Sequence, residues 1–415
     1  MPTWLLWAIG GVAVFAWGTY IAHLLLEERW IFNSVQVFAF SDLAERYHDA
    51  HILLVHGDLY DNRGEAFSYP PIVGYLFVPS HAIGFKSTAI VVTIVTMFST
   101  AMLFALSLER FMLVPLARAW FVSAVVLAPL AVFALYPYHD VVLEGQLGAI
   151  LLLMVFVDLF VVPKRHRGYL IGIATAIKLV PGIFIFWLLV KREISGVARA
   201  LTAFLVVTIV AWILWPHGST EFWFHILPSP QSIGRINSRA TSDYGSYWYG
   251  GLGSPDNQSL LGLLSRPPFL RPGVFPWLPL ALALLAGGVW VTARLIRQSR
   301  ELAGFCVLAL TMVLVSPVSW LHYWVFVGLL PAVAWLEWRR DRPLALGAIA
   351  LVLVTCVNLD AQFFPLRQPH AWPAASLFIL RNLYVLGGLI FLAIAVLRAS
   401  RADQSRSVDL LPAAA

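Results

Sequence analysis

Residues 40–84 read FSDLAERYHDAHILLVHGDLYDNRGEAFSYPPIVGYLFVPSHAIG, a polar stretch in a chain that is mostly apolar. The stretch follows one long apolar run, residues 4–26. It holds several of the 22 acidic residues of the chain, namely Asp42, Glu45, Asp49, Asp58, Asp61 and Glu65. An acid-rich connection that follows a first membrane span is where we expect the chemistry of this protein.

The composition predicts a membrane protein. Of 415 residues, 60% are hydrophobic and 12% are charged, and the mean hydropathy is +0.79. Uncharged runs of about 20 residues recur, which is the length that a helix needs to cross a bilayer. We therefore expect an all-α polytopic membrane domain over residues 1–401, followed by a disordered cytoplasmic tail, residues 402–415.

The basic residues separate the apolar runs. They form short clusters, namely Lys164-Arg165-His166-Arg167, Lys191-Arg192, Arg294/Arg297/Arg300, Arg339/Arg340/Arg342 and Arg398/Arg401. Such clusters mark the cytoplasmic face of a membrane protein, so the net charge of +6 does not indicate nucleic-acid binding. The apolar runs are residues 4–26, 70–84, 87–108, 115–136, 146–162, 168–190, 199–215, 277–297, 302–317, 320–338, 343–358 and 377–397.

Two of these runs do not fit a simple crossing. Residues 70–84 are short and are interrupted by prolines and glycines, which favours a helix at the outer interface. Residues 168–190 have basic residues at both ends and hold Lys178 and Pro181 at the centre. A hairpin of two half-helices would return both ends to the cytoplasm, and such breaks are tolerated where they line a protein cavity.

With these two changes, every basic cluster lies inside, both termini are cytoplasmic, and the chain has about 12 membrane helices. The outer segments become residues 27–86, which we call the first outer loop, 137–145, 216–276 (the large outer loop), the Ser316–His322 corner and 359–376. These segments also hold most of the unusual polar and aromatic residues.

A helix is expected over residues 43–56, on the membrane surface, because Leu43, Tyr47, Ala50 and Leu54 lie on one face. Asp42 and Glu45 have the spacing of a capping box at its start, and Gly57 would end it. Asp58 then follows the negative end of the helix dipole, which makes it a stronger base. This suits a general base that takes a proton from a sugar hydroxyl, although the spacing alone favours a solvated surface acid in a loop.

Two further sites of polar residues lie in apolar surroundings. The nine-residue outer loop YHDVVLEGQ, around residues 137–145, holds His139, Asp140, Glu144 and Gln146. They could orient a polar substrate, with simple solvation as the alternative. Lys178 is a cation within an apolar run, which is typical of a functional residue whose partner is an anion such as Glu144 or a lipid phosphate. Snorkelling of the ammonium to the interface is the alternative.

The large outer loop and the corner after it carry aromatic and amide side chains. Trp248 can stack on a sugar ring, and Asn257 and Gln258 can bond its hydroxyls. Tyr69, Arg266, Trp320 and His322 complete the candidate residues, with His322 as a contact to a phosphate or as a structural histidine. Cys306 and Cys356 lie in apolar runs and are expected in the core. The sequence contains no metal motif, P-loop or nucleophile elbow.

The order of these motifs is similar to a known family. The motifs are GDLYDNRGEAFSYPPIVGYLFVP, EGQLGAILLLMVFVDL, GYLIGIATAIKLVPGIFIFWLLVKRE, NQSLLGLL and SPVSWLHYWVF, in this order after a first helix. The chain resembles the GT-C membrane glycosyltransferases, and among these the polyprenyl-phosphate-mannose-dependent α-1,2-mannosyltransferases. The resemblance spans nearly the whole chain.

The resemblance implies a function. A mannose would pass from polyprenyl-phosphate-mannose to a phosphatidylinositol mannoside, converting the tetramannoside to the pentamannoside with inversion, on the periplasmic side of the plasma membrane. An Asp of the first outer loop would be the base, which favours Asp58 and leaves Asp42, Asp49 and Asp61 open. Lys178, His322 and Arg266 would hold the phosphate, while Glu144, His139, Asn257, Gln258 and Trp248 would hold sugars.

Other expectations follow from the same resemblance and from the missing metal spacing: no metal cofactor and a monomeric enzyme. Two alternatives remain. The same donor could serve α-1,2 branching of lipomannan or lipoarabinomannan, or the protein could be a lipid or sugar transporter. A transporter often has internal repeats and polar residues along its whole path, whereas here the polar residues gather on one face.

Overall fold

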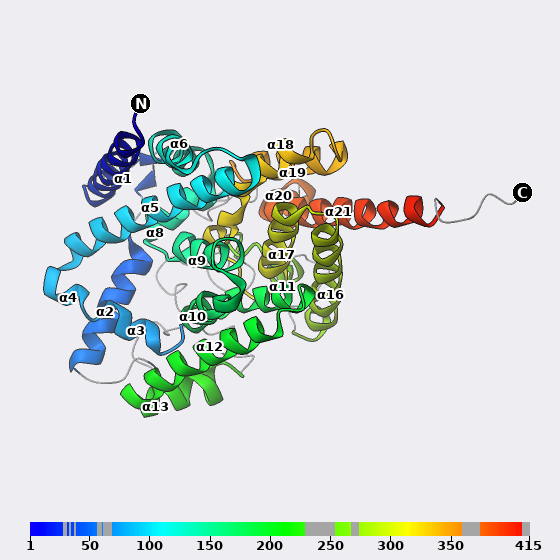
Figure 1. Cartoon of the computed structure of the whole chain (residues 1–415). Coiled ribbons are helices and arrows are strands. Elements are labelled where there is room, and N and C mark those ends of the chain that lie inside the picture. The colour runs from blue at the N-terminus through cyan, green and yellow to red at the C-terminus, as the bar shows by residue number, and fades with distance from the viewer. Residues whose placement is uncertain are drawn as a thin grey trace, which may run out of the picture.

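The computed structural model describes residues 1–27, 31–32, 35–36, 39–55, 60, 69–228, 254–266, 274–358 and 374–408. These residues fold almost entirely into helices (Figure 1). The first part of the chain contains α1 (Thr3–Leu26), α2 (Ser41–Val55), α3 (Ile72–Phe77), α4 (Ser80–Ile83), α5 (Phe85–Met112), α6 (Leu116–Val122), the π-helix η1 (Ser123–Leu127), α7 (Ala128–Ala134), α8 (Tyr136–Glu144) and α9 (Gly148–Phe160).

The rest of the chain continues this pattern. It contains η2 (Lys164–His166), α10 (Tyr169–Ile177), η3 (Val180–Phe184), α11 (Ile185–Val190), α12 (Ile194–Leu214), α13 (Pro216–Thr220), η4 (Glu221–Ile226), α15 (Leu260–Ser265), α16 (Val274–Arg297), α17 (Glu301–Val315), η5 (Leu321–Leu329), α18 (Leu330–Glu337), α19 (Arg342–Val354), α20 (Ala374–Arg381) and α21 (Leu383–Val408). Two short strands, β1 (Ile31–Phe32) and β2 (Val35–Gln36), pair antiparallel after α1.

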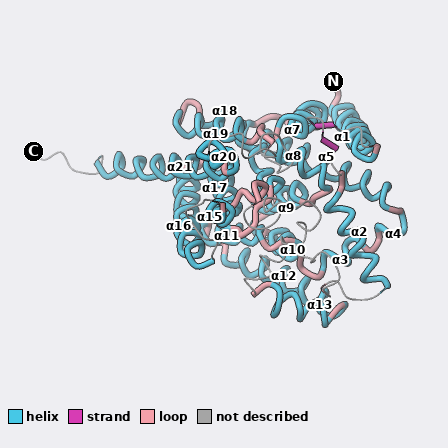
Figure 2. Tube along the Cα trace, turned by 180° about the vertical axis from the view of Figure 1, so that it is seen from behind, coloured by secondary structure: helices cyan, strands magenta, loops and turns pink. Residues whose placement is uncertain are grey.

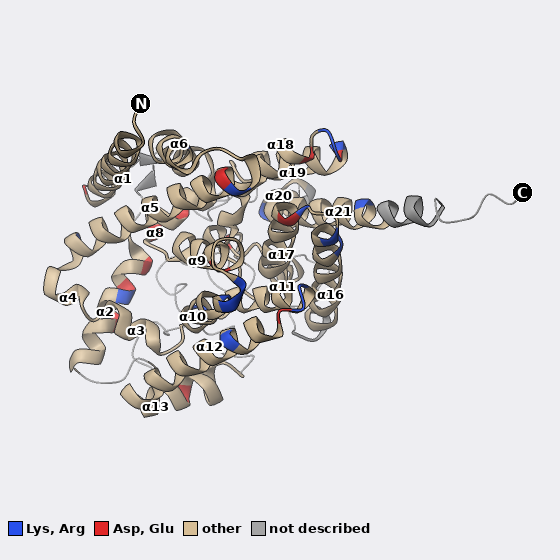
Figure 3. Cartoon of the chain, viewed as in Figure 1, with Lys and Arg blue, Asp and Glu red and all other residues tan. Residues whose placement is uncertain are grey.

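Six helices in the described part of the chain are long and apolar enough to cross a membrane. They are Thr3–Leu26, Phe85–Met112, Leu116–Ala134, Ile194–Leu214, Trp277–Arg297 and Leu383–Ser400. Charged residues are sparse along these helices and lie mostly near their ends (Figure 3). The prediction of a helical, multi-pass membrane protein is therefore confirmed, and the expected number of about 12 crossings stays a prediction.

The helices differ in how deeply they lie. In α17, apolar residues such as Phe305 and Leu308 are fully buried, and α16 packs along its side in both views (Figures 1 and 2). Around Phe305 pack the rings of Phe156, Phe160, Phe184 and Trp187. By contrast, only 17% of the most apolar 18-residue stretch of α12 is buried. An apolar helix face of this kind in a membrane protein is covered by lipid.

Residues 168–190 form the hairpin that the sequence predicts. The helix α10 ends at Lys178, whose backbone is extended, and η3 and α11 lead back. A straight helix would place Arg167 and Glu193 about 39 Å apart, yet their side chains form an ion pair of 2.8 Å. Gly168 lies against the backbone of Gly196, where a Cβ would meet a carbonyl oxygen at 2.1 Å. Lys178 therefore lies at the tip of a hairpin whose two ends meet.

In residues 70–84, α3 and α4 together are too short to cross a bilayer, as expected, and their place at the outer interface stays a prediction. The expectation for residues 137–145 was wrong. This segment is the helix α8, not a loop, and it is buried along most of its length. The chain bends by 115° between α8 and α9, and Gly145 at this corner has a left-handed conformation (φ 67°). Proline near its start and glycine at its end are helix signals that the sequence analysis did not use.

Two smaller expectations differ from the structure. Cys306 is buried in α17 as predicted, but Cys356, just past the end of α19, is exposed, so its assignment to the core was wrong. The helix α21 continues to Val408 and projects from the body of the molecule (Figure 1), past the point where we expected the tail to begin. Residues 409–415 lie outside the described residues.

Candidate functional site

Glu144, at the end of α8, caps the start of α2. Its carboxylate accepts hydrogen bonds from the Ser41 hydroxyl and, at 3.4 Å, from the backbone N–H of Asp42. The first N–H groups of a helix have no partner within the helix, so a carboxylate there satisfies them and opposes the helix dipole. Next to it, the N–H of Phe40 donates to the carbonyl of Leu143 at 2.6 Å. These bonds join the end of α8 to the start of α2, next to the Asp42 side chain.

The capping box expected at Asp42 and Glu45 stays a prediction. Glu45 pairs with Arg46 at 3.1 Å. Arg46 also pairs with Asp49 at 2.7 Å, which holds its guanidinium against the helix. The guanidinium carbon lies 4.5 Å from the centre of the Tyr69 ring, a distance typical of a cation–π contact. The helix α2 thereby places an acid and a cation beside Tyr69.

Asp42 begins a chain of hydrogen bonds that reaches the hairpin tip. The amide nitrogen of Gln146 donates to Asp42 Oδ2. The hydroxyl of Tyr69 donates to Gln146 Oε1 at 3.0 Å, and Lys178 Nζ donates to the Tyr69 oxygen at 3.4 Å. Four residues from the first outer loop, the α8–α9 corner and the hairpin are joined in this way.

The Lys178 ammonium lies between two aromatic rings. It is 3.7 Å from the centre of the Tyr323 ring and 5.2 Å from the centre of the Tyr69 ring. The residue is 8% exposed, and none of the described residues forms an ion pair with it. A buried cation without an anionic partner is costly in apolar surroundings. This position is suited to hold an anion that arrives with a ligand.

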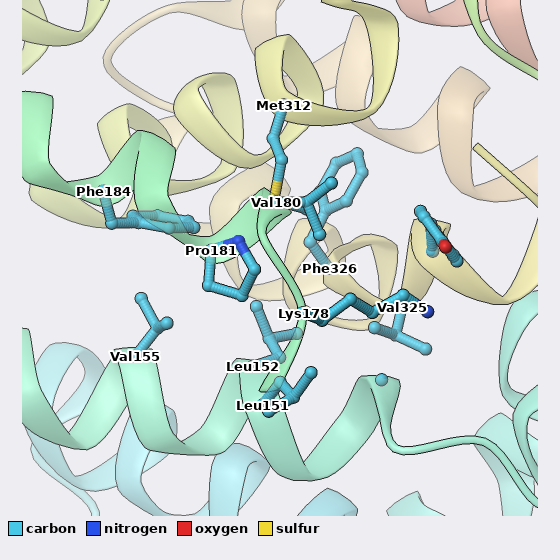
Figure 4. Close-up of a pocket in the computed structure, with 12 residues that line it drawn as sticks. Leu151, Leu152, Val155, Lys178, Val180, Pro181, Phe184, Met312, Val325 and Phe326 are labelled. Atoms are coloured by element: carbon cyan, nitrogen blue, oxygen red, sulfur yellow. The ribbon is translucent and has the colours of Figure 1, made fainter. Parts of the chain in front are cut away.

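A pocket, which we call the apolar pocket, lies beside Lys178. Lys178 and Tyr323 supply its polar groups, and the hairpin tip, α9 and η5 supply its walls (Figure 4). Its apolar lining consists of Leu151, Leu152, Val155, Val180, Pro181, Phe184, Met312, Val325 and Phe326. This combination fits a ligand that is mostly hydrocarbon and carries an anionic group near one end.

A second pocket, the polar pocket, is lined in part by Tyr69, whose hydroxyl contacts Lys178. Its polar lining comes from Asp42, Arg46, Tyr69 and Gln146, and Val73, Phe77, Gly145 and Leu147 complete it. An aromatic ring, an amide and charged groups within one small pocket suit a sugar, whose ring stacks and whose hydroxyls form hydrogen bonds.

Burial in this pocket wall raises the pKa of Tyr69 to about 12, because the phenolate would lose its water. The negative charge of Asp42 raises the pKa further, and Arg46 opposes the rise. Tyr69 therefore keeps its proton at every pH at which an enzyme works, and it can donate to Gln146.

His322 lies nearby in η5 and is 3% exposed. Its Nδ1 is 3.1 Å from Asp140 Oδ2, while Nε2 is buried and has no hydrogen-bond partner among the described residues. An acid that binds one ring nitrogen fixes the orientation of a histidine, and with Nδ1–H donating to Asp140, Nε2 would be the acceptor. Gly148 approaches the backbone of His322 so closely that a Cβ would meet its carbonyl oxygen at 3.2 Å.

Comparison with known proteins decides the family. Residues 67–317, more than half of the chain, match the model of glycosyltransferase family 87. The chain belongs to glycosyltransferase family 87. The matched region includes Tyr69, Gln146 and Lys178, and it ends at the corner that leads to His322. The protein is therefore an enzyme of the glycosyltransferase class.

Curated relatives agree with this family 87 assignment. The chain is 28% identical over 374 residues to a Mycobacterium tuberculosis protein named polyprenol-phosphate-mannose-dependent alpha-(1-2)-phosphatidylinositol mannoside mannosyltransferase, covering 85% of this chain and 81% of the relative. It is 29% identical over 341 residues to a Mycolicibacterium smegmatis protein of the same name, covering 75% and 73%. A Mycobacterium tuberculosis phosphatidylinositol pentamannoside mannosyltransferase is 26% identical over 74% of this chain and 67% of the relative. No solved structure matches the chain significantly.

Among the predicted site residues of this family 87 enzyme, the structure brings Tyr69, Lys178, Glu144 and His322 to one region. Glu144 caps a helix there, so its observed contacts are structural. His139 is buried in α8, where its ring lies 5.5 Å from that of Tyr136. Asp58, which the sequence favoured as the base, and Trp248 lie outside the described residues. Their roles stay predictions.

Three other predicted residues hold the protein together at a separate place. Both side-chain ends of Asn257 bond the corner before η5, at Pro317 and Ser319. Gln258 is equally buried and bonds the carbonyl of Arg381 at 2.7 Å and the N–H of Val385 at 3.1 Å. Their amides are thus directed at backbone groups, so the observed contacts do not extend to a ligand pocket.

Arg266 belongs to the same cluster. Its guanidinium donates to the carbonyl of Arg381 and to Asn382 Oδ1, each at 2.6 Å, and to two further carbonyls of its own segment. Arg266 thereby holds Asn257, which in turn bonds the Ser316–His322 corner. Trp320, the residue before η5, is half-buried at the end of this corner. The expected role of Arg266 in binding phosphate stays a prediction.

Two contributors were missed from sequence. Arg46 follows Asp42 by one helical turn, so its place on the same face could have been found from helical spacing. Tyr323 follows His322 directly, and no local pattern distinguishes it from the aromatic residues that are common at membrane interfaces.

Proposed function

We propose that this family 87 enzyme transfers mannose from polyprenyl-phosphate-mannose to a phosphatidylinositol mannoside, with inversion and an α-1,2 linkage. The observation that carries the proposal is the Lys178 ammonium, buried and without an ion-pair partner among the described residues, at the polar end of an apolar pocket. A polyprenyl phosphate has the matching chemistry. The names of the relatives support the same donor and the same class of acceptor.

In this proposal the two pockets take the two substrates. The apolar pocket receives the donor, with isoprene units against Leu152 and Phe326 and the phosphate beside Lys178. The polar pocket receives the terminal mannose of the acceptor, next to Asp42 and Arg46. The transferred sugar would lie between them, near Tyr69, which belongs to one pocket wall and contacts the cation of the other.

The base is an Asp of the first outer loop, and Asp42 is the one that the described site contains. Its carboxylate takes the proton of the acceptor 2-hydroxyl while that oxygen attacks C1 of the donor mannose. The bond from C1 to the phosphate oxygen breaks, and its electron pair leaves with the phosphate. Lys178 stabilises the charge that develops on the phosphate, and His322 can add a hydrogen bond to it when Nε2 carries a proton.

Further parts of the proposal concern the membrane. The fold is of the GT-C type with about 12 membrane helices, the site faces the periplasm at the plasma membrane, and both termini are cytoplasmic. The hairpin supports this arrangement, because its basic ends meet on one side and its tip, Lys178, lies at the site. The enzyme is proposed to act as a monomer and without a metal, since the sequence contains no acids with metal-binding spacing.

The acceptor is proposed to be the tetramannoside, which becomes the pentamannoside. The test is transfer of labelled mannose from polyprenyl-phosphate-mannose by the purified protein in detergent, with the tetramannoside, the pentamannoside and lipomannan as separate acceptors. We expect the label on the tetramannoside, and activity that persists in excess chelator. Label that remains on the donor with all three acceptors contradicts the proposal, because detergent removes the two compartments that a transporter needs.

A further inference from the structure

Gln146 and Tyr69 connect the two pockets. The polar pocket contains Asp42, Tyr69 and Gln146, and the apolar pocket contains Lys178. The connection is the chain of hydrogen bonds that runs from Lys178 to Tyr69, then to Gln146 and then to Asp42. The two groups that the proposed reaction needs, a proton acceptor and a cation, are thus joined through two neutral side chains.

The direction of each bond in this chain is fixed by chemistry. An ionised carboxylate accepts only, so Gln146 must direct its NH₂ group at Asp42 and its carbonyl oxygen at Tyr69. That oxygen accepts only, so Tyr69 donates to it and offers its own lone pairs to Lys178. Rotation of the Gln146 amide by half a turn would set oxygen against oxygen at Asp42. One arrangement of the four side chains is therefore strongly preferred.

The chain leaves one oxygen of the base available. Gln146 binds Asp42 Oδ2, and among the described residues none donates to Oδ1. The backbone of Asp42 is held separately by the Glu144 carboxylate. A carboxylate that is fixed at its backbone and at one oxygen presents the other oxygen in a defined direction, which is what a general base requires.

We propose that Gln146 is a positioning residue that aims Asp42 at the acceptor hydroxyl and, through Tyr69, sets its position relative to Lys178. This inference rests on the proposed mannosyl transfer. When a phosphate takes the ammonium of Lys178, Tyr69 loses one donor but keeps its bond to Gln146. The orientation of the base therefore persists when the donor binds, and Gln146 acts on turnover rather than on donor binding.

The test compares Gln146→Leu and Gln146→Glu with Gln298→Leu, a control that also removes an amide bonded to one neighbour, Arg300, but far along the chain from the pockets. For Gln146→Leu we expect kcat to fall by about 10- to 100-fold. The KM for polyprenyl-phosphate-mannose should change less than about twofold, and Gln298→Leu should match the wild type. An unchanged kcat in Gln146→Leu, or a rise in donor KM alone, overturns the inference.

The Gln146→Glu variant distinguishes positioning from simple packing, because it keeps the shape of the side chain. The introduced carboxyl group, while protonated, can donate to Asp42 as the amide does, whereas the ionised group repels it. Since paired carboxylates share a proton, we expect a new fall of kcat with rising pH, roughly between pH 6 and 8. The charged and titratable groups that face this position are Asp42 and Arg46 on α2, Asp140 and Glu144 on α8, Lys178 at the hairpin tip, and His322 in η5. All of them are present in the wild type as well, so the wild-type pH profile is the reference for this comparison.

A pH profile of Gln146→Glu that is parallel to that of the wild type contradicts the inference. Retained thermal stability in detergent shows that each variant is folded, so a low rate cannot be assigned to unfolding. The proposed function fails differently: the wild-type protein itself would transfer no mannose from polyprenyl-phosphate-mannose. If the wild type is active and the Gln146 variants match it in kcat and pH profile, the positioning role is disproved and the proposed function is not contradicted.

Discussion

The Lys178 ammonium lies 3.7 Å from the centre of the Tyr323 ring, although 145 positions separate the two residues in the sequence. A cation over a ring is stabilised without an anion. The site can therefore hold a buried positive charge before any phosphate arrives. The weak further bond to Tyr69, at 3.4 Å, leaves this ammonium able to turn to a ligand.

Replacement of Lys178 by Met keeps the length of the side chain and removes its charge. We expect transfer to fall by about 100-fold or more, because the phosphate then leaves without a cation. The measurement is kcat/KM for the donor, and Lys86→Met, at an exposed position at the start of α5, is the matched control. Equal rates for Lys178→Met and the wild type would remove Lys178 from the mechanism.

The identity of the base is tested by Asp42→Asn and Asp58→Asn in parallel. Asn keeps the size of the side chain but cannot take a proton, so we expect Asp42→Asn to fold, to bind the donor and to lose roughly 100- to 10,000-fold in kcat. Asp58→Asn should retain most of the activity. The reverse result, an inactive Asp58→Asn beside an active Asp42→Asn, assigns the base to Asp58 as the sequence alone favoured.

Two substitutions of Glu144 distinguish a structural role of this residue from a role in substrate binding. If it acts as the cap of α2, Glu144→Gln keeps an acceptor for Ser41 and should keep most of the activity. Glu144→Ala removes the cap, and we expect about 1 kcal/mol less stability of the segment. Limited proteolysis of the first outer loop and thermal unfolding in detergent measure this loss. A Glu144→Gln variant that is stable but inactive would instead indicate contact with the substrate.

Substitutions of Gly168 and Gly196 test whether the two ends of the hairpin meet. Gly168 has a φ of 113°, and an added Cβ would lie 2.1 Å from the carbonyl oxygen of Gly196. Gly168→Ala should therefore lower the unfolding temperature, with a cost of about 1 kcal/mol or more. At Gly196 the nearest atom to a new Cβ is 3.4 Å away, so Gly196→Ala should be nearly neutral. Equal stability of both variants would show that the hairpin ends do not meet as described.

The raised pKa of Tyr69 makes a prediction at alkaline pH. The folded protein keeps the phenolic proton up to about pH 12, whereas the unfolded chain releases it near pH 10. The contribution of this proton to stability is therefore fully present below pH 10 and is lost as the pH rises toward 12. Thermal unfolding should show a steeper alkaline decline in the wild type than in Tyr69→Phe. Identical slopes would contradict the burial of this hydroxyl.

The raised pKa of Tyr69 also makes a prediction about how activity depends on pH. Because Tyr69 stays protonated between pH 6 and 9, its removal should lower kcat by the same factor across that range. A Tyr69→Phe effect that grows or shrinks with pH in this interval would mean that the hydroxyl ionises during turnover.

The sequence by itself determined the class of the protein and its helices. Long uncharged runs are a local property, so the spans and the break at Lys178 and Pro181 could be predicted from neighbouring residues. The mixture of polar residues in residues 40–84 and the lysine within an apolar run indicated two segments that line the pockets described above. The buried helix α8 was misassigned as a loop because its polar residues, such as Asp140, suggested exposure to water.

Only the tertiary structure decided which of these residues meet. Asp42 and Gln146 are 104 positions apart, and Tyr69 and Lys178 are 109 apart, so no periodicity in the sequence relates them. The packing of the first outer loop against the α8–α9 corner and the hairpin tip makes these pairs. The same packing turned Glu144 into a helix cap, directed Asn257 and Gln258 to backbone groups, and directed Arg266 to backbone carbonyls and the Asn382 side chain, because buried polar groups are almost always hydrogen-bonded.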